Sequence, residues 1–288
     1  MTLPALSPDA PPARPAPRGL ADALLGGAAG FWLLTALAGQ WAFSWYIANF
    51  YGPPMLTGDY AAWGVLKAMG AKGYVPGDDA GNRFFGFHAL AAGIVALGGA
   101  LQFIPQIRNR WPVFHRWNGR VFLLTVVGLS LSGFWLVWVR GSSPSPLNAW
   151  STSLNGVLIL TFAALAWRAA VGRRFDVHRR WALRLYLVSN AQWFLRIGLF
   201  AWFVGNMALG RRPAMDDPFL IAWVPGCYLV PLAVAELYLR ARDGGGPLTR
   251  LGLAALLVVL TLLMALGVFA FAMFTQRILS GAPLSLPG

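Results

Sequence analysis

The chain has 288 residues, of which 57% are hydrophobic and only 11% are charged, and its mean hydropathy is +0.58. Soluble domains carry about 25% charged residues, so this composition excludes a soluble enzyme and a disordered chain. The net charge is +13, but 21 of the 23 basic residues are Arg and lie mostly between long apolar segments, as in membrane proteins rather than nucleic-acid-binding proteins. The composition therefore predicts an all-α, polytopic membrane protein. The single Cys227 excludes an internal disulfide framework and a c-type haem attachment.

The apolar segments predict seven transmembrane helices, because a helix needs about 20 apolar residues to cross a bilayer. We expect these spans at 24–48, 84–105, 117–139, 151–170, 181–206, 219–239 and 251–275. Spans two to five are expected to form a four-helix core. The predicted organisation, in chain order, is a disordered cytoplasmic tail (1–20), a first transmembrane helix (21–50), an outer loop (51–83), the four-helix core (84–206), two C-terminal helices (207–278) and a tail (279–288).

The distribution of Arg and Lys predicts the orientation of these spans. With seven spans, 14 basic residues fall on the side of the N-terminus and 7 on the other side. By the positive-inside rule, we expect the N-terminus in the cytoplasm and the C-terminus outside, in a bacterial cytoplasmic membrane. A short Ala36-Leu37-Ala38 motif resembles a signal cleavage site, but the apolar segment continues beyond it, which favours a retained helix.

Two basic motifs that contain histidine lie 63 residues apart, at the expected cytoplasmic starts of spans three and five. They read His115-Arg116-Trp117-Asn118-Gly119-Arg120 and His178-Arg179-Arg180-Trp181-Ala182-Leu183-Arg184. Two imidazoles at one membrane depth suit the axial ligands of a haem iron, and Arg116, Arg120, Arg179 and Arg184 suit its propionates. Gly119 and Gly133 follow the face of His115, where small residues leave room either for a flat cofactor or for close helix packing. The alternative is that the His and Arg residues only anchor helix ends and contact lipid phosphates.

Further polar residues lie inside the expected spans and are candidates for a binding site or for structural hydrogen bonds: His88, Gln102, Asn155, Gln192 and Arg196. Arg196 is the most costly of them, and we expect it to face the bundle interior or a hydrated cavity. Glu236 matches Arg184 in depth, which predicts an ion pair between them. Pro225 and Pro231 should bend span six.

The stretch from His88 to about Phe203 resembles a family of bacterial membrane proteins known as domain of unknown function 2306. The matching features are His88, Gly98-Gly99-Ala100-Leu101-Gln102-Phe103, the two His-Arg motifs, and Arg196. The resemblance covers about 40% of the chain. It implies a shared fold and a shared set of polar positions, and it implies no established activity.

More distantly, the arrangement is similar to the two-haem cytochrome b superfamily, whose four-helix core carries ligand pairs on the first and third and on the second and fourth helices. This similarity implies that His115 and His178 form the inner pair and bind one haem b near the cytoplasmic face. The position equivalent to His88 in the third core helix is Ser151, so an outer haem lacks a second histidine ligand.

We therefore expect a membrane redox protein that exchanges electrons with quinone or a partner protein, although whether it is an enzyme stays open. The first alternative is a non-catalytic accessory or assembly subunit of a membrane complex, whose His and Arg residues bind lipid or a partner. The second is a carrier of a small molecule, with Arg196 and His88 lining its cavity. The bilayer is an expected partner in each case, and nucleic acid is in none.

Overall fold

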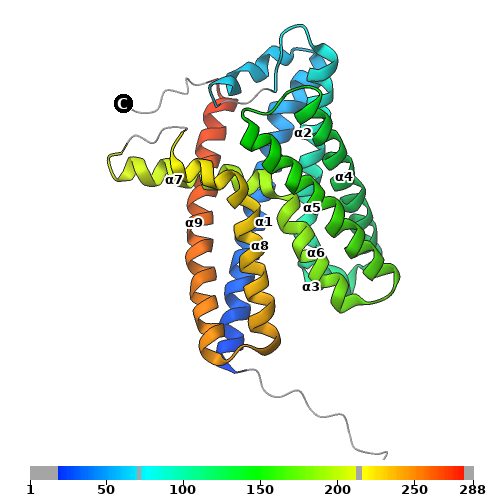
Figure 1. The fold of residues 1–288 in the computed structure, drawn as a ribbon, viewed down its shortest axis with the longest axis vertical. Helices are drawn as coiled ribbons and strands as arrows, with labels where there is room; N and C mark the ends of the chain where they lie inside the picture. The colour runs from blue at the N-terminus through cyan, green and yellow to red at the C-terminus, as the bar shows by residue number, and fades with distance from the viewer. Residues whose placement is uncertain (1–18, 70–72, 212–215, 282–288) are drawn as a thin grey trace, which may run out of the picture.

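The computed structural model describes residues 19–69, 73–211 and 216–281, and within these ranges all of the regular secondary structure is helical (Figure 1). The expected tail at 1–20 lies outside the described residues except at its last two positions, as does most of the expected tail at 279–288. The elements in chain order are α1 (Leu20–Thr57), η1 (Tyr60–Met69), α2 (Asp79–Gly99), η2 (Ala100–Phe103), α3 (Pro105–Arg110), α4 (Pro112–Trp138), α5 (Pro146–Val171), α6 (Phe175–Ser189), α7 (Ala191–Ala208), α8 (Pro218–Gly244) and α9 (Pro247–Leu279).

The prediction of an all-α, polytopic membrane fold is confirmed. In the described part of the chain, six helices are long and apolar enough to cross a bilayer, or seven if the bent pair α6–α7 is one span. Exposed Trp side chains gather near the two ends of these helices, as expected for residues at the membrane–water interfaces. They are Trp111, Trp117 and Trp167 at one end, and Trp135, Trp138 and Trp150 at the other.

The first helix is longer than the expected span, because α1 continues through Pro53 and Pro54. A proline inside a helix removes a backbone hydrogen bond, but these two lie within the last turn and a half, where few bonds are lost. The helix ends at Gly58, whose φ of 81° is left-handed and whose N–H donates to the Pro54 carbonyl at 2.9 Å. The expected outer loop is therefore helical at its start, and it contains η1 as well.

Span five differs most from its expectation, because it consists of two helices bent by 54° at Asn190. The side chains of Ser189 and Asn190 donate to the carbonyl oxygens of Leu185 and Tyr186, at 2.8 Å in each case. The backbone N–H of Asn190 donates to the Val188 carbonyl, so the Asn190 side chain takes over the Tyr186 carbonyl, which is how such residues end helices. Figure 1 shows α7 lying across the bundle while α6 runs along it.

The helices pack so that α1 lies between α9 and α2, while α7 crosses α9 and contacts α8. The expected four-helix core is formed by α2, α4, α5 and α6, in which consecutive helices are in contact. Phe122 of α4 and Tyr186 of α6 both reach the surface of Gly99 on α2, where a Cβ atom would lie 3.0 and 3.1 Å from their rings. The four helices therefore close into a ring, in which α4 and α6 stand opposite each other.

Candidate functional site

The two histidines of the basic motifs lie at the same end of the four-helix core. His115 is in the first turn of α4 and His178 is in the first turn of α6. They precede Phe122 and Tyr186, which meet at Gly99, by seven and eight residues, or about two helical turns on each helix. The two imidazoles are close enough to interact electrostatically. Both residues that the sequence pairs therefore lie at one end of the core.

Each imidazole has a nitrogen that no other described residue engages. Nδ1 of His178 lies 3.0 Å from the carbonyl oxygen of Ala166 on α5, so this nitrogen carries the proton and donates. Nε2 of His178 then keeps its lone pair, which is the arrangement typical of a histidine that binds a metal. Nδ1 of His115 is buried, and among the described residues it has no hydrogen-bond partner. The backbone carbonyl of His115 accepts a 3.4 Å hydrogen bond from the Gln102 side chain.

The arginines of the two motifs fall into two groups. Arg179 forms an ion pair with Asp176 on its own helix, and Arg184 forms two hydrogen bonds with Glu236 of α8, at 2.6 and 2.9 Å. The predicted Glu236–Arg184 pair is confirmed. Because carboxylates of the chain already neutralise these two guanidinium groups, they are poorer candidates for a cofactor's carboxylates than the sequence alone indicates.

The second group of arginines is exposed around His115. Arg116 lies near enough to act electrostatically on the imidazole, as does Arg108 at the end of α3. Arg120 stacks on Trp117, with its guanidinium carbon 4.9 Å from the ring centre. These three positive charges leave the His115 side of the site strongly basic, which suits an anionic group.

Side chains of neighbouring elements occupy the space beside the two small residues of α4, Gly119 and Gly133. A Cβ atom at Gly119 would lie 3.3 Å from Oε1 of Gln102, and one at Gly133 would lie 3.7 Å from the His88 ring. Side chains of η2 and α2 occupy this face of α4. Of the two alternatives for Gly119 and Gly133, these contacts favour close helix packing over room for a flat cofactor.

His88 lies at the opposite end of the core from the other two histidines. Its Nδ1 is 2.8 Å from the Ser132 hydroxyl of α4, and that hydroxyl in turn donates to the Leu129 carbonyl at 3.2 Å. Because the hydroxyl hydrogen is used in this way, His88 donates from Nδ1 to the Ser132 oxygen. This bond connects α2 to α4, so a neighbouring helix satisfies one nitrogen of His88.

Arg196 lies on α7, beyond the bend; it is half-buried, and its guanidinium faces buried aromatic residues of α1. It donates to the backbone and side-chain oxygens of Gln192, at 2.8 and 3.3 Å, and its guanidinium carbon is 5.3 Å from the centre of the Phe43 ring. Among the described residues no carboxylate pairs with it. Asn155, another of the predicted polar residues, is buried on α5. Its Oδ1 has no hydrogen-bond partner among the described residues.

A buried amide that the sequence analysis missed lies against the bend in span five. Gln40 of α1 is 0% exposed, and its Oε1 accepts a 3.1 Å hydrogen bond from the Tyr186 hydroxyl. Its Nε2 has no partner among the described residues, and the same holds for Nε1 of the buried Trp193. Gln40 lies in an apolar run with no charged neighbour in sequence, so only its polarity inside a span signals it.

A polar cluster at the opposite end of the molecule from His115 was also missed. Arg140 follows α4 and is only 4% exposed; it donates to Asp78 Oδ2 at 2.9 Å and to Asn82 Oδ1 at 2.7 Å. The guanidinium of Arg140 holds the pKa of the Asp78 carboxyl below its usual value. Asn82 also bonds both backbone groups of Val75 at 2.9 Å. The cluster fastens the segment before α2 to the α4–α5 connection, and we assign it a structural role.

The comparisons with known proteins rest on this same part of the chain. A family model described as predicted membrane protein DUF2306 matches residues 85–239, from the start of α2 to the end of α8. The chain belongs to the DUF2306 family. The match includes all three histidines, Arg196 and Glu236. No curated protein matches the sequence, and no solved structure does.

Proposed function

We propose that this DUF2306 protein is a redox protein of the bacterial cytoplasmic membrane, which holds one b-type haem with His115 and His178 and exchanges electrons with quinone or a partner protein. The observation that carries the proposal is that two imidazoles from opposite helices lie at the same end of the core and interact electrostatically, each with a nitrogen that no described residue engages. When bound, such a haem supplies one-electron chemistry at its iron.

The roles of the surrounding residues follow from their contacts. The Ala166 carbonyl fixes the ring orientation of His178 and the tautomer that leaves Nε2 free. Arg108, Arg116 and Arg120 would supply positive charge for the carboxylates of such a haem. Phe122 and Tyr186 fill the centre of the core about two helical turns from the two histidines. The macrocycle of a bound haem would therefore lie toward the basic end of the bundle. With one such group near one face, electron transfer across the membrane needs quinone or another protein.

The test is a visible spectrum of the detergent-purified protein, oxidised and then reduced with dithionite, together with haem quantified per chain. We expect about one b-type haem per chain, lost in both His115→Ala and His178→Ala. His88→Ala is the matched control, because His88 already bonds Ser132 at the other end of the core, and it should keep its haem. A colourless protein from cells with adequate haem supply refutes the proposal, as does full haem in either ligand variant.

A non-catalytic accessory or assembly subunit is the second candidate. It is favoured by the filled positions beside Gly119 and Gly133, and by the carboxylates that already neutralise Arg179 and Arg184. In this case the protein should co-purify with a stable membrane complex and carry no chromophore. Combined substitution of His115, His178 and the exposed arginines should then abolish the complex, and an intact complex would exclude this role.

A further inference from the structure

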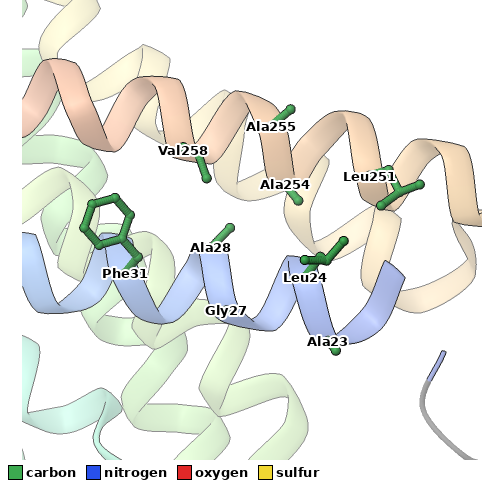
Figure 2. A pocket seen from close by; sticks show the side chains of 9 residues that line it. All are labelled: Ala23, Leu24, Gly27, Ala28, Phe31, Leu251, Ala254, Ala255 and Val258. Carbon is green, nitrogen blue, oxygen red and sulfur yellow. The ribbon is translucent and has the colours of Figure 1, made fainter. Parts of the chain in front are cut away.

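Two hollows flank the first half of α9 at the end of the bundle that carries most of the arginines. One lies between α1 and α9 and has a volume of about 440 Å³; Figure 2 shows that small and apolar side chains of both helices line it, Leu24, Ala28, Ala254 and Val258 among them. The other lies between α8 and α9 and has a volume of about 500 Å³. Only this second groove has a charged residue, Arg240, in its lining.

Three other arginines at this end of the bundle are paired, whereas among the described residues Arg240 and its neighbour Arg242 are not, and of these two only Arg240 lines the groove. Arg180, Arg184 and Arg250 pair with Asp243, Glu236 and Asp22, at 2.7, 2.6 and 2.8 Å. No carboxylate of the described residues pairs with Arg240, which is exposed at the mouth of the groove. An anion from outside the chain is therefore the natural partner for this guanidinium.

The rest of the lining adds a polar mouth and an apolar wall. Thr249 contributes a hydroxyl to the lining, whereas Gly244 and Gly245 contribute no side chain. Leu237, Leu253 and Leu256 form the wall that runs along the helices. A phosphate suits the guanidinium and the hydroxyl, while a hydrocarbon chain suits the wall. A free phosphate would leave the apolar wall unused, and an apolar partner helix would leave Arg240 without a counter-charge.

We propose that the α8–α9 groove binds one anionic phospholipid, with its phosphate on Arg240 and Thr249 and an acyl chain along Leu237, Leu253 and Leu256. The α1–α9 groove lacks a charge and is not part of this site. The expected orientation agrees, because it places the arginine-rich end in the cytoplasmic leaflet, where anionic lipids attract basic residues. The proposal is independent of the haem site, since none of these residues contributes to it.

The chain offers two variants and a matched control for a sharp test. Arg240→Gln removes the charge at the mouth, whereas Arg242→Gln removes the neighbouring exposed charge of α8 that does not line the groove. Gly252→Leu fills the groove, and it is compatible with the fold because no atom lies within 4 Å of a Cβ atom at this position. The readout is native mass spectrometry of the full chain released from mixed phosphatidylglycerol and phosphatidylcholine vesicles, with thermal unfolding as the check of folding.

We expect one retained phosphatidylglycerol per chain in the wild type and in Arg242→Gln. Arg240→Gln should reduce its occupancy about fivefold relative to phosphatidylcholine, in line with the usual strength of one basic residue at an anionic membrane surface. Gly252→Leu should remove the bound lipid while the protein still unfolds at its normal temperature. Equal losses of bound phosphatidylglycerol in Arg240→Gln and Arg242→Gln would overturn the proposal. A Gly252→Leu variant that keeps its lipid would also overturn it, as would a wild-type dimer that Gly252→Leu dissociates.

Discussion

The crossing of α7 and α9 depends on one glycine, and its replacement gives the most direct test of the fold. A Cβ atom at Gly267 would lie 2.2 Å from the carbonyl oxygen of Ile197 and 2.8 Å from its carbonyl carbon. Both atoms belong to the backbone of α7, so a rotamer change of a side chain cannot relieve the contact. In Gly267→Ala the two helices must separate by roughly 0.8 Å to bring the contact even to 3.0 Å.

This separation sets the magnitude that we expect. Overpacking a well-packed site costs about 1–3 kcal/mol, and a rigid backbone obstacle places Gly267→Ala at the upper end of that range. Alanine regains about 0.5–1 kcal/mol over glycine inside a helix, which offsets a small part of the cost. A net loss of about 2 kcal/mol corresponds to a fall in the unfolding midpoint of about 4–8 °C.

Thermal unfolding in detergent, followed by circular dichroism, measures the effect. Gly205→Ala on α7 is the matched control, because a Cβ atom there has no neighbour within 4 Å and the gain in helix propensity is the same. The difference between the two variants therefore isolates the crossing. If Gly267→Ala unfolds at the same temperature as Gly205→Ala or above it, the close backbone approach of α7 and α9 is wrong.

Three polar contacts are open to similar tests. Gln40→Leu leaves the buried Tyr186 hydroxyl without its acceptor and should lower the free energy of unfolding by about 1–2 kcal/mol. The double variant with Tyr186→Phe should recover most of this loss. Additive losses in a double-mutant cycle would refute the bond. Glu236→Gln should cost at most about 1 kcal/mol, because the pair with Arg184 is partly exposed, and the loss measured by unfolding should shrink in high salt. The lowered pKa of Asp78 means that its charge stabilises the fold above its ordinary pKa, and that this is lost as the pH falls through the lowered value. Unfolding midpoints of the wild type and Asp78→Asn should therefore differ at neutral pH and converge in acid, and a constant difference would contradict this.

For the site, the sequence predicted which residues meet but not what surrounds them. The two His-Arg motifs each begin a helix, and two helices that run in the same direction place their first turns at one level. The sequence was therefore enough to predict that His115 and His178 lie at the same end of the core. The filling of the space beside Gly119 by Gln102 was not, because it depends on the register between α2 and α4. The pair between Glu236 and Arg184 was accessible because their depths in the membrane match.

The sequence alone determined that this is an all-α membrane protein, because long apolar segments with few charges have no other stable arrangement in a bilayer. It also determined the extent of most spans, since apolar length and flanking arginines set them. Only the tertiary structure decided the break at Asn190, where side-chain hydrogen bonds replace backbone ones, and the enclosure of Arg140 by Asp78 and Asn82. The Arg140 cluster joins residues distant in the chain, and the break depends on which carbonyl groups the Ser189 and Asn190 side chains bond; no pattern of polarity specifies either.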